Sequence, residues 1–417
     1  MTASRALLIV WLLAGSMAWA ATAPPENPKV SGLVTGLDLT SAEALGWTPE
    51  QHDTARHYSR GNWALFFAGS IWQIGTLALL ALSGLAGRIV SAVEARVKGR
   101  LAADAVALAA LILVLATLNF PMEILRHARE RRYGFVTQSV AGWLRDELIG
   151  LVVVTLLGLI VLLPLYAVIR RWPRRWWAIG SVIGALFIVF VMAVAPVFIA
   201  PLFNKFTPLS DQDLKQRILD LAHRNGIAAD DVYQVDASRQ SRHDNAYVAG
   251  MLGTQRIVLY DTLLAAYQPA EIEFVMGHEM GHYVLRHIWK GVTFAAVLLG
   301  VGLYLTYRVM QRLLPSCAAR LGFSAAGSVA SMPLVGLCLS TFFFVIAPID
   351  NSFSRMLEHQ ADVFGLEATS TDRPAAVQAF QRMAGRNLSD PNPPALIEWW
   401  IYSHPSTGRR IRFVAGQ

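Results

Sequence analysis

Residues 274–285 read FVMGHEMGHYVL, an apolar run that contains the pattern His-Glu-x-x-His. His278 and His282 are four residues apart, so on a helix they project from one face and can bind the same metal ion. Glu279 follows the first histidine, where a general base can take a proton from a metal-activated water. The pattern indicates a zinc hydrolase, and the competing interpretation is two histidines satisfied within a buried helix.

A third metal ligand must come from elsewhere, and its identity separates the classes of zinc hydrolase. One class continues the pattern as His-Glu-x-x-His-x-x-Gly-x-x-His. Leu285 and Ile288 stand where that class has glycine and histidine, and His287 misses the histidine position by one. This class is therefore excluded.

The other class takes a glutamate from a later helix. Residues 354–362 read SRMLEHQAD and place Glu358 and Asp362 one helical turn apart. Glu358 would complete a His₂Glu site with an open fourth position. Asp362 could accept a hydrogen bond from the unligated ring nitrogen of His278 or His282. Alone, Glu358 could equally be a helix residue that faces water, but its pairing with Asp362 favours the ligand.

The composition indicates a membrane protein, because 54% of the residues are hydrophobic and only 16% are charged. Six segments approach or exceed the roughly 20 apolar residues that a membrane-spanning helix needs. These lie near 63–87, 101–124, 148–169, 176–199, 288–310 and 327–350. Kinked helices are expected, since prolines occur at Pro121, Pro164, Pro196, Pro333 and Pro348.

The N-terminal 21 residues form a separate segment. A weakly basic start is followed by an apolar stretch, and Ala18-Trp19-Ala20 precedes Ala21 as a small-residue cleavage site. This pattern predicts a cleaved signal peptide, with an uncleaved seventh span as the alternative. Residues 22–61 would then form an extramembrane segment.

The positive net charge of +7 does not indicate a nucleic-acid partner, because the arginines cluster at the ends of apolar spans, as in 170–175. The short loops near 88–100, 170–175 and 308–325 carry more Lys and Arg than the opposite segments. That bias favours a zinc site on the periplasmic side of a bacterial inner membrane. Cys317 and Cys338 lie in or beside spans and support no disulfide framework.

Two stretches outside the spans hold every candidate zinc residue, so we expect a metallopeptidase domain in two parts. These are 201–287 and 351–417, separated by a helix pair at 288–350 and preceded by membrane helices at 62–200.

The first part is expected to be mixed α/β. Ser210 would cap a helix that ends near Asn225, strands are expected at 232–238 and 256–260, and Pro269 would begin the helix of the His-Glu-x-x-His pattern. The second part is expected to be helical, with the Glu358 helix, one near 373–386 and one after Pro405.

Further motifs follow in order along the chain. They are Arg131-Arg132-Tyr133-Gly134-Phe135 with Asp146, IAPLFNKFTPL at 199–209, Asn245-Ala246-Tyr247, Gly277–His287, Ser354–Asp362, and Tyr402-Ser403-His404-Pro405 followed by Arg410. Together they resemble the CaaX prenyl endopeptidases of the a-factor-converting type, which are multi-span zinc metallopeptidases of the gluzincin group. The resemblance covers most of the chain from about residue 60.

This resemblance implies roles for individual residues. His278, His282 and Glu358 match the ligands of one Zn²⁺, and Glu279 matches the catalytic base. The family also has a ring of helices around a water-filled chamber that the zinc site closes at one end. Its seventh, N-terminal span corresponds here to the segment that resembles a signal peptide.

Three more residues acquire roles from the same resemblance. Asn245 matches a position on the edge strand that holds the substrate backbone, consistent with an extended peptide adding itself to a sheet. His404 matches a histidine that stabilises the developing oxyanion. Arg410 would anchor the C-terminal segment or help to hold substrate.

The sequence thus predicts a predominantly α-helical polytopic membrane protein, with six or seven spans in a ring and a small α/β zincin-like domain. We expect a zinc metalloendopeptidase that cleaves hydrophobic, membrane-associated or CaaX-like peptides or membrane proteins. Two alternatives remain open: a membrane scaffold or transporter that retains a zinc site, and a hydrolase of a non-peptide amide.

Overall fold

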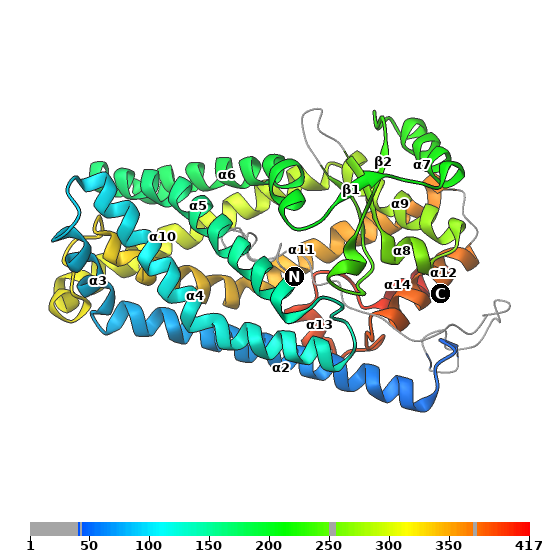
Figure 1. The fold of residues 1–417 in the computed structure, drawn as a ribbon, viewed down its shortest axis with the longest axis horizontal. Coiled ribbons are helices and arrows are strands. Elements are labelled where there is room, and N and C mark those ends of the chain that lie inside the picture. The colour runs from blue at the N-terminus through cyan, green and yellow to red at the C-terminus, as the bar shows by residue number, and fades with distance from the viewer. Residues whose placement is uncertain (1–40, 42–43, 250–255, 370–372) are drawn as a thin grey trace.

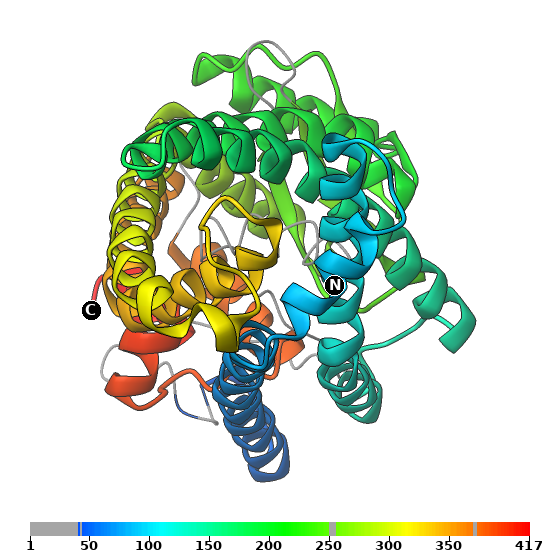
Figure 2. The same ribbon diagram turned by 90° about the vertical axis from the view of Figure 1, so that its left-hand side faces the viewer.

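The computed structural model describes residues 41, 44–249, 256–369 and 373–417. The segment 1–21, expected to be a signal peptide or a seventh span, lies outside these residues. Within the described chain, six helical stretches are long and apolar enough to cross a membrane. They run along the long axis of the molecule, and an end-on view shows them arranged as a ring (Figures 1 and 2).

The first four of these stretches precede the four-stranded sheet and the helices packed on it. Their helices are α2 (Pro49–Leu82), α4 (Arg100–Arg132), α5 (Val140–Arg171) and α6 (Trp176–Val194), with the short α3 (Leu85–Glu94) between α2 and α4. A π-helical turn (Ala195–Ile199) and a 3₁₀ turn (Ala200–Leu202) extend α6 toward the first strand. The last two spanning stretches contain α10 (His287–Leu321) and α11 (Met332–Thr369).

The first span differs from its expected limits of 63–87 at both ends. It begins at Pro49, where Thr48 and Gln51 form a capping box, so part of the expected extramembrane segment 22–61 is helical. It ends at Leu82, because Gly84 adopts a left-handed conformation with φ 73° and α3 starts in a new direction.

The last span differs more consequentially, because it does not end near residue 350. Helix α11 continues without a break to Thr369 and carries Glu358 and Asp362, so the expected boundary between 288–350 and 351–417 falls inside one helix. A polar residue at this point of the helix has a hydrogen-bond partner. Asn351 is buried, and its Nδ2 donates to Trp400 O at 2.6 Å. Glu358, the predicted third ligand, therefore lies on the same helix as the last candidate span.

A four-stranded sheet lies at one end of the ring, in the order β1-β2-β4-β3 (Figure 1). The strands are β1 (Phe206–Pro208), β2 (Val232–Val235), β3 (Ala246–Ala249) and β4 (Arg256–Tyr260). Strands β2 and β4 are parallel, and the two outer pairings are antiparallel. The expected strands at 232–238 and 256–260 correspond to β2 and β4, and β3 lies where the resemblance implies an edge strand at Asn245. Strand β1 was not expected.

Six described helices form a domain together with this sheet. They are α7 (Gln212–Arg224), α8 (Asp261–Ala266), α9 (Pro269–Val284), α12 (Arg373–Arg386), α13 (Ala395–Ile401) and α14 (Thr407–Ala415). Helix α7 is capped by Asp211, whose side chain accepts from Leu214 N, and not by Ser210. One apolar core joins the sheet to these helices, with Ile257 of β4, Met276 of α9 and Ile411 of α14 fully buried in it.

Candidate active site

The site forms where α9 crosses α11, and glycines permit the close approach of the two helices. A Cβ on Gly365 of α11 would lie 3.0 Å from the backbone nitrogen of His278, and one on Gly277 of α9 would lie 2.5 Å from Thr369 Cγ2. At Gly365 the backbone of α9 would have to shift by a few tenths of an ångström, and at Gly277 the Thr369 side chain would have to move. The absence of a Cβ at these positions therefore sets the distance between the two halves of the site.

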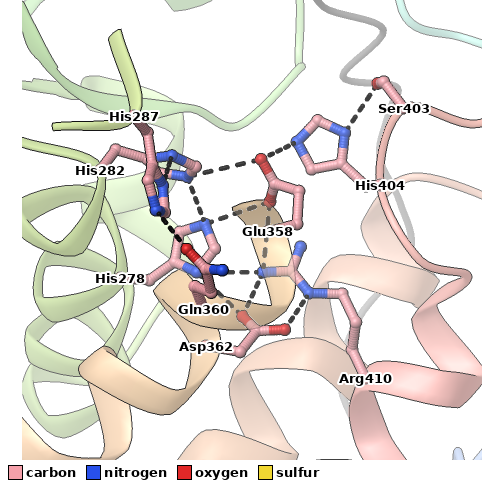
Figure 3. A network of polar contacts seen from close by, with 9 residues as sticks. All are labelled: His278, His282, His287, Glu358, Gln360, Asp362, Ser403, His404 and Arg410. Atoms are coloured by element: carbon pink, nitrogen blue, oxygen red, sulfur yellow. Dashed lines mark hydrogen bonds and ion pairs between the residues drawn. The ribbon is translucent and has the colours of Figure 1, made fainter. Parts of the chain in front are cut away.

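Three side chains converge at this crossing (Figure 3). His278 Nε2 lies 3.1 Å from His282 Nε2 and 3.3 Å from Glu358 Oε2, and His282 Nε2 lies 3.4 Å from Glu358 Oε1. All three ligand atoms lie within 4.8 Å of one another. The structure thus brings together the three residues that the sequence assigns to the metal, from α9 and α11.

The second nitrogen of His278 is held by a carboxylate. His278 Nδ1 lies 2.9 Å from Asp362 Oδ1, which also accepts from Arg410 Nη2 at 2.5 Å. Arg410 Nε donates to Asp362 Oδ2 at 2.9 Å, and the guanidinium carbon lies 4.3 Å from the centre of the Phe380 ring. Arg410 Nη2 lies 3.3 Å from the same Nδ1, a longer contact than the one to Asp362. The shorter contact is to a carboxylate, which only accepts, so Nδ1 carries the proton and the Nε2 lone pair faces the cluster.

The second nitrogen of His282 is held by His287, which misses the ligand position of the excluded zinc class by one residue. His282 Nδ1 lies 3.1 Å from His287 Nδ1, and His287 Nε2 lies 3.1 Å from Gln360 Oε1. Lys290 Nζ, which only donates, lies 3.4 Å from the same oxygen and supports this orientation of the amide. His287 therefore donates to Gln360 and accepts from His282, which again turns the Nε2 lone pair of His282 toward the cluster.

His287 reaches His282 because the chain reverses tightly between α9 and α10. Only Leu285 and Arg286 separate the two helices, and Arg286 adopts a left-handed conformation with φ 57°. His287 is the first residue of α10 and is only 3% exposed. A left-handed arginine has no strong sequence signal, so nothing local indicated this contact.

Glu279 lies between the two histidines on α9. Burial is the main reason that its pKa is raised to about 7, with the Glu358 carboxylate acting in the same direction and His278 opposing it. A bound dication beside it would favour the carboxylate and lower this pKa. With a dication bound, Glu279 would be ionised near neutral pH and able to accept a proton.

The C-terminal segment brings His404 to the opposite side of Glu358. His404 Nε2 lies 3.3 Å from Glu358 Oε1, and its Nδ1 lies 2.9 Å from Ser403 Oγ. Arg355 of α11 fixes the segment by donating to Tyr402 O at 2.6 Å and Glu398 O at 3.0 Å. The His404 side chain remains 45% exposed, so it can meet a ligand at the cluster.

Asn245 immediately precedes β3, at the edge of the sheet. Its backbone oxygen accepts from Tyr260 N at 3.0 Å, and its Oδ1 accepts from Ala246 N at 2.9 Å. Strand β3 pairs with β4 on one side, and no described strand pairs with its other side. The strand packs against α9, so an unpaired strand edge runs beside the metal-site helix.

The donor set fits a metal ion. Two imidazole nitrogens with lone pairs and one carboxylate point at one another, a set of ligands typical of Zn²⁺. Glu358 Oε2 is buried and has no hydrogen-bond partner among the described residues, as expected for an atom that completes its coordination with a cation. The polar partners of both histidines also select the tautomer that metal binding requires.

Comparison with known proteins agrees with this geometry. Residues 208–417 match the model of peptidase family M48, and residues 41–205 match that of the CAAX prenyl protease N-terminal region with five membrane helices. The chain belongs to peptidase family M48. It is a membrane zinc metalloprotease of the CAAX prenyl protease family, as the resemblance predicted.

Relatives support the family along most of the chain. An uncharacterized metalloprotease, YhfN, of Bacillus subtilis is 32% identical over 87% of this chain and 85% of its own. CAAX prenyl protease 1 of Saccharomyces cerevisiae is 28% identical over 82% of this chain and 76% of its own. The crystal structure of Ste24p from S. mikatae has a TM-score of 0.78 at 24% identity and covers 91% of this chain and 92% of its own, which shows a shared fold.

Proposed function

We propose that this M48 protease holds one Zn²⁺ through His278, His282 and Glu358 and hydrolyses peptide bonds with Glu279 as the general base. The observation that carries this proposal is the convergence of these three ligands, with Glu279 adjacent to the first. Bound there, zinc would lower the pKa of a water toward about 7 and polarise the substrate carbonyl.

Glu279 and His404 would have different roles in the reaction. Glu279 takes the proton from the attacking water and returns it to the leaving amine. With Ser403 Oγ–H donating to His404 Nδ1, His404 Nε2 would carry the proton and donate a hydrogen bond to the developing oxyanion. Ser403 Oγ–H, which contacts His404 Nδ1, would hold that tautomer.

The substrate backbone would pair with the free side of β3. An extended peptide added there runs beside α9, and Asn245 stands at the start of the strand. Arg410 is buried, and two of its nitrogens are taken by Asp362, so we assign it the anchoring role and not substrate binding. The unpaired strand favours a peptide over a small amide.

We infer that substrates are membrane proteins or membrane-associated peptides. Glu358, the proposed third ligand, lies on a helix that continues from a candidate membrane span, which supports a cleavage site close to the bilayer. Several relatives are named CAAX prenyl proteases, so a CaaX-like prenylated tail is one substrate class to test. The Bacillus relative favours a bacterial membrane, and the loop charges favour a site on the periplasmic side of an inner membrane.

The test is cleavage of two quenched peptides, one hydrophobic and one prenylated, by the full-length protein in detergent. We expect turnover that is lost on chelation with 1,10-phenanthroline and restored by zinc. A protein that binds one zinc but cleaves neither peptide, nor a membrane-protein substrate in vesicles, would instead be a zinc-containing scaffold or transporter.

A further inference from the structure

A cavity of about 530 Å³ lies outside the zinc site, between the start of α5, the turn after α6 and the sheet. Its lining includes four cationic side chains and one carboxylate: Arg145, Lys205, Arg239, Arg256 and Asp236. None of the proposed zinc or catalytic residues contributes to it. We propose that this cavity binds the phosphate of an anionic phospholipid.

The floor of the cavity is a built structure and not a chance gathering of surface charges. Asp236 accepts from the backbone nitrogen of Lys205 at 2.7 Å and from Asn204 Nδ2 at 3.3 Å. Arg239 donates to the backbone oxygen of Phe203 and lies 3.8 Å from Asp146, a fully buried carboxylate. These bonds fix the segment 203–205 against the turn that follows β2.

The remaining three cations are available to a ligand. Arg145, Lys205 and Arg256 form no ion pair with any acidic side chain in the described ranges, and Asp236 is occupied with the floor of the cavity. The Arg256 guanidinium lies over the ring of Tyr233, with its carbon 5.5 Å from the ring centre, which fixes its direction. Three unpaired cations around a cavity of this size favour a phosphate group with its ester substituents.

The surroundings favour a lipid over a soluble phosphate. Beside Arg145, α5 exposes Leu144, Leu148 and Val152, which follow one another at intervals of four residues on one face. Leu202 lines the cavity, and Phe198, one helical turn earlier, is 67% exposed. Helix α5 and the turn after α6 share a core through Val153, Ile199 and Phe203, so these apolar surfaces lie together. A lipid could place its headgroup in the cavity and its acyl chains along these surfaces.

This site lies at the junction of the membrane helices with the sheet, and it has a structural consequence. The segment that forms its wall leads directly into β1, whose Phe206 also lines the cavity. A bound lipid would therefore hold the catalytic domain against the bilayer surface. The proposal does not depend on which substrate the protease cleaves.

The test is native mass spectrometry of the full-length protein in detergent, titrated with phosphatidylglycerol, phosphatidylcholine or inorganic phosphate. We expect a one-to-one complex with phosphatidylglycerol, weaker binding of phosphatidylcholine, and no displacement of the lipid by millimolar phosphate. The triple variant Arg145→Gln, Lys205→Gln, Arg256→Gln should bind phosphatidylglycerol about a hundredfold more weakly, since each cation contributes about fivefold.

A matched control removes three exposed arginines elsewhere, through Arg131→Gln, Arg132→Gln and Arg224→Gln, and should retain parent affinity. Unchanged lipid binding in the first triple variant, or equal losses in both, would overturn the proposal. Phosphate that binds as tightly as the lipid would contradict the lipid assignment. If the triple variant fails to fold, Arg145→Gln and Arg256→Gln alone should each lose about fivefold, and no loss in either would again refute the site.

Discussion

The Nδ1 atoms of His282 and His287 lie 3.1 Å apart. His287 does not have the spacing of a third metal ligand, but it orients His282, which is one of the proposed ligands. Through Gln360, His287 selects the His282 tautomer whose Nε2 faces the cluster. Partners of this kind typically change metal affinity by about 10–100-fold when removed.

His287→Ala should weaken zinc binding by about 10–100-fold, because His282 loses the acceptor that orients its ring. The measurement is zinc affinity by competition with a chromophoric chelator. Lys290→Gln provides the control, since Lys290 contacts Gln360 but not the histidines, and it should weaken zinc binding much less than His287→Ala does. Unchanged zinc affinity in His287→Ala would contradict this role.

Gly365→Ala should also weaken zinc binding, for a steric reason. The added Cβ would lie 3.0 Å from His278 N and would push α11 away from α9, separating Glu358 from the two histidines. Gly291→Ala is the control, because a Cβ at that helical position meets nothing within 4 Å. If both variants bound zinc equally well, the close crossing of α9 and α11 would not determine the zinc affinity.

Arg410→Gln should destabilise the protein by about 3–5 kcal/mol, because the Asp362 carboxylate would remain buried without its charged partner. Arg217→Gln is the matched control: that arginine is 60% exposed and its partner Glu273 is also reached by solvent, so their ion pair should contribute about 0–1 kcal/mol. Unfolding in denaturant at saturating zinc measures both. Similar losses in the two variants would refute the anchoring role of Arg410.

Zinc should raise the unfolding temperature of the metal-free protein, since a ligand that binds only the folded state stabilises it by about 2.7 kcal/mol at 100 times its Kd. Glu358→Gln should abolish most of this shift, because the cluster then lacks its carboxylate. Thermal unfolding at increasing free zinc measures the effect. A shift of parent size in that variant would mean that zinc binds elsewhere.

Residue spacing was sufficient to predict which side chains of α9 and α11 lie together. The four-residue intervals in His278–His282 and Glu358–Asp362 specify helix faces, and the structure brings those faces together. The spans were predictable from apolar length, because composition alone decides which segments can cross a bilayer.

Contacts that depend on tertiary packing could not be predicted in this way. The buried Asn351 of α11 has Trp400 O as its partner, which lies far along the chain. The His287 contact depends on the left-handed turn at Arg286, and strand β3 depends on pairing with β4. Hydrophobic periodicity carries no information on any of these partners.

The central claim, that Glu279 is the general base of a zinc peptidase, is tested most directly by Glu279→Gln. The amide keeps the shape of the side chain but cannot take the proton, so the account predicts turnover at least about 100-fold below the parent. Zinc content, measured on the same sample, should remain one per chain. Turnover near the parent rate with zinc bound would contradict the account.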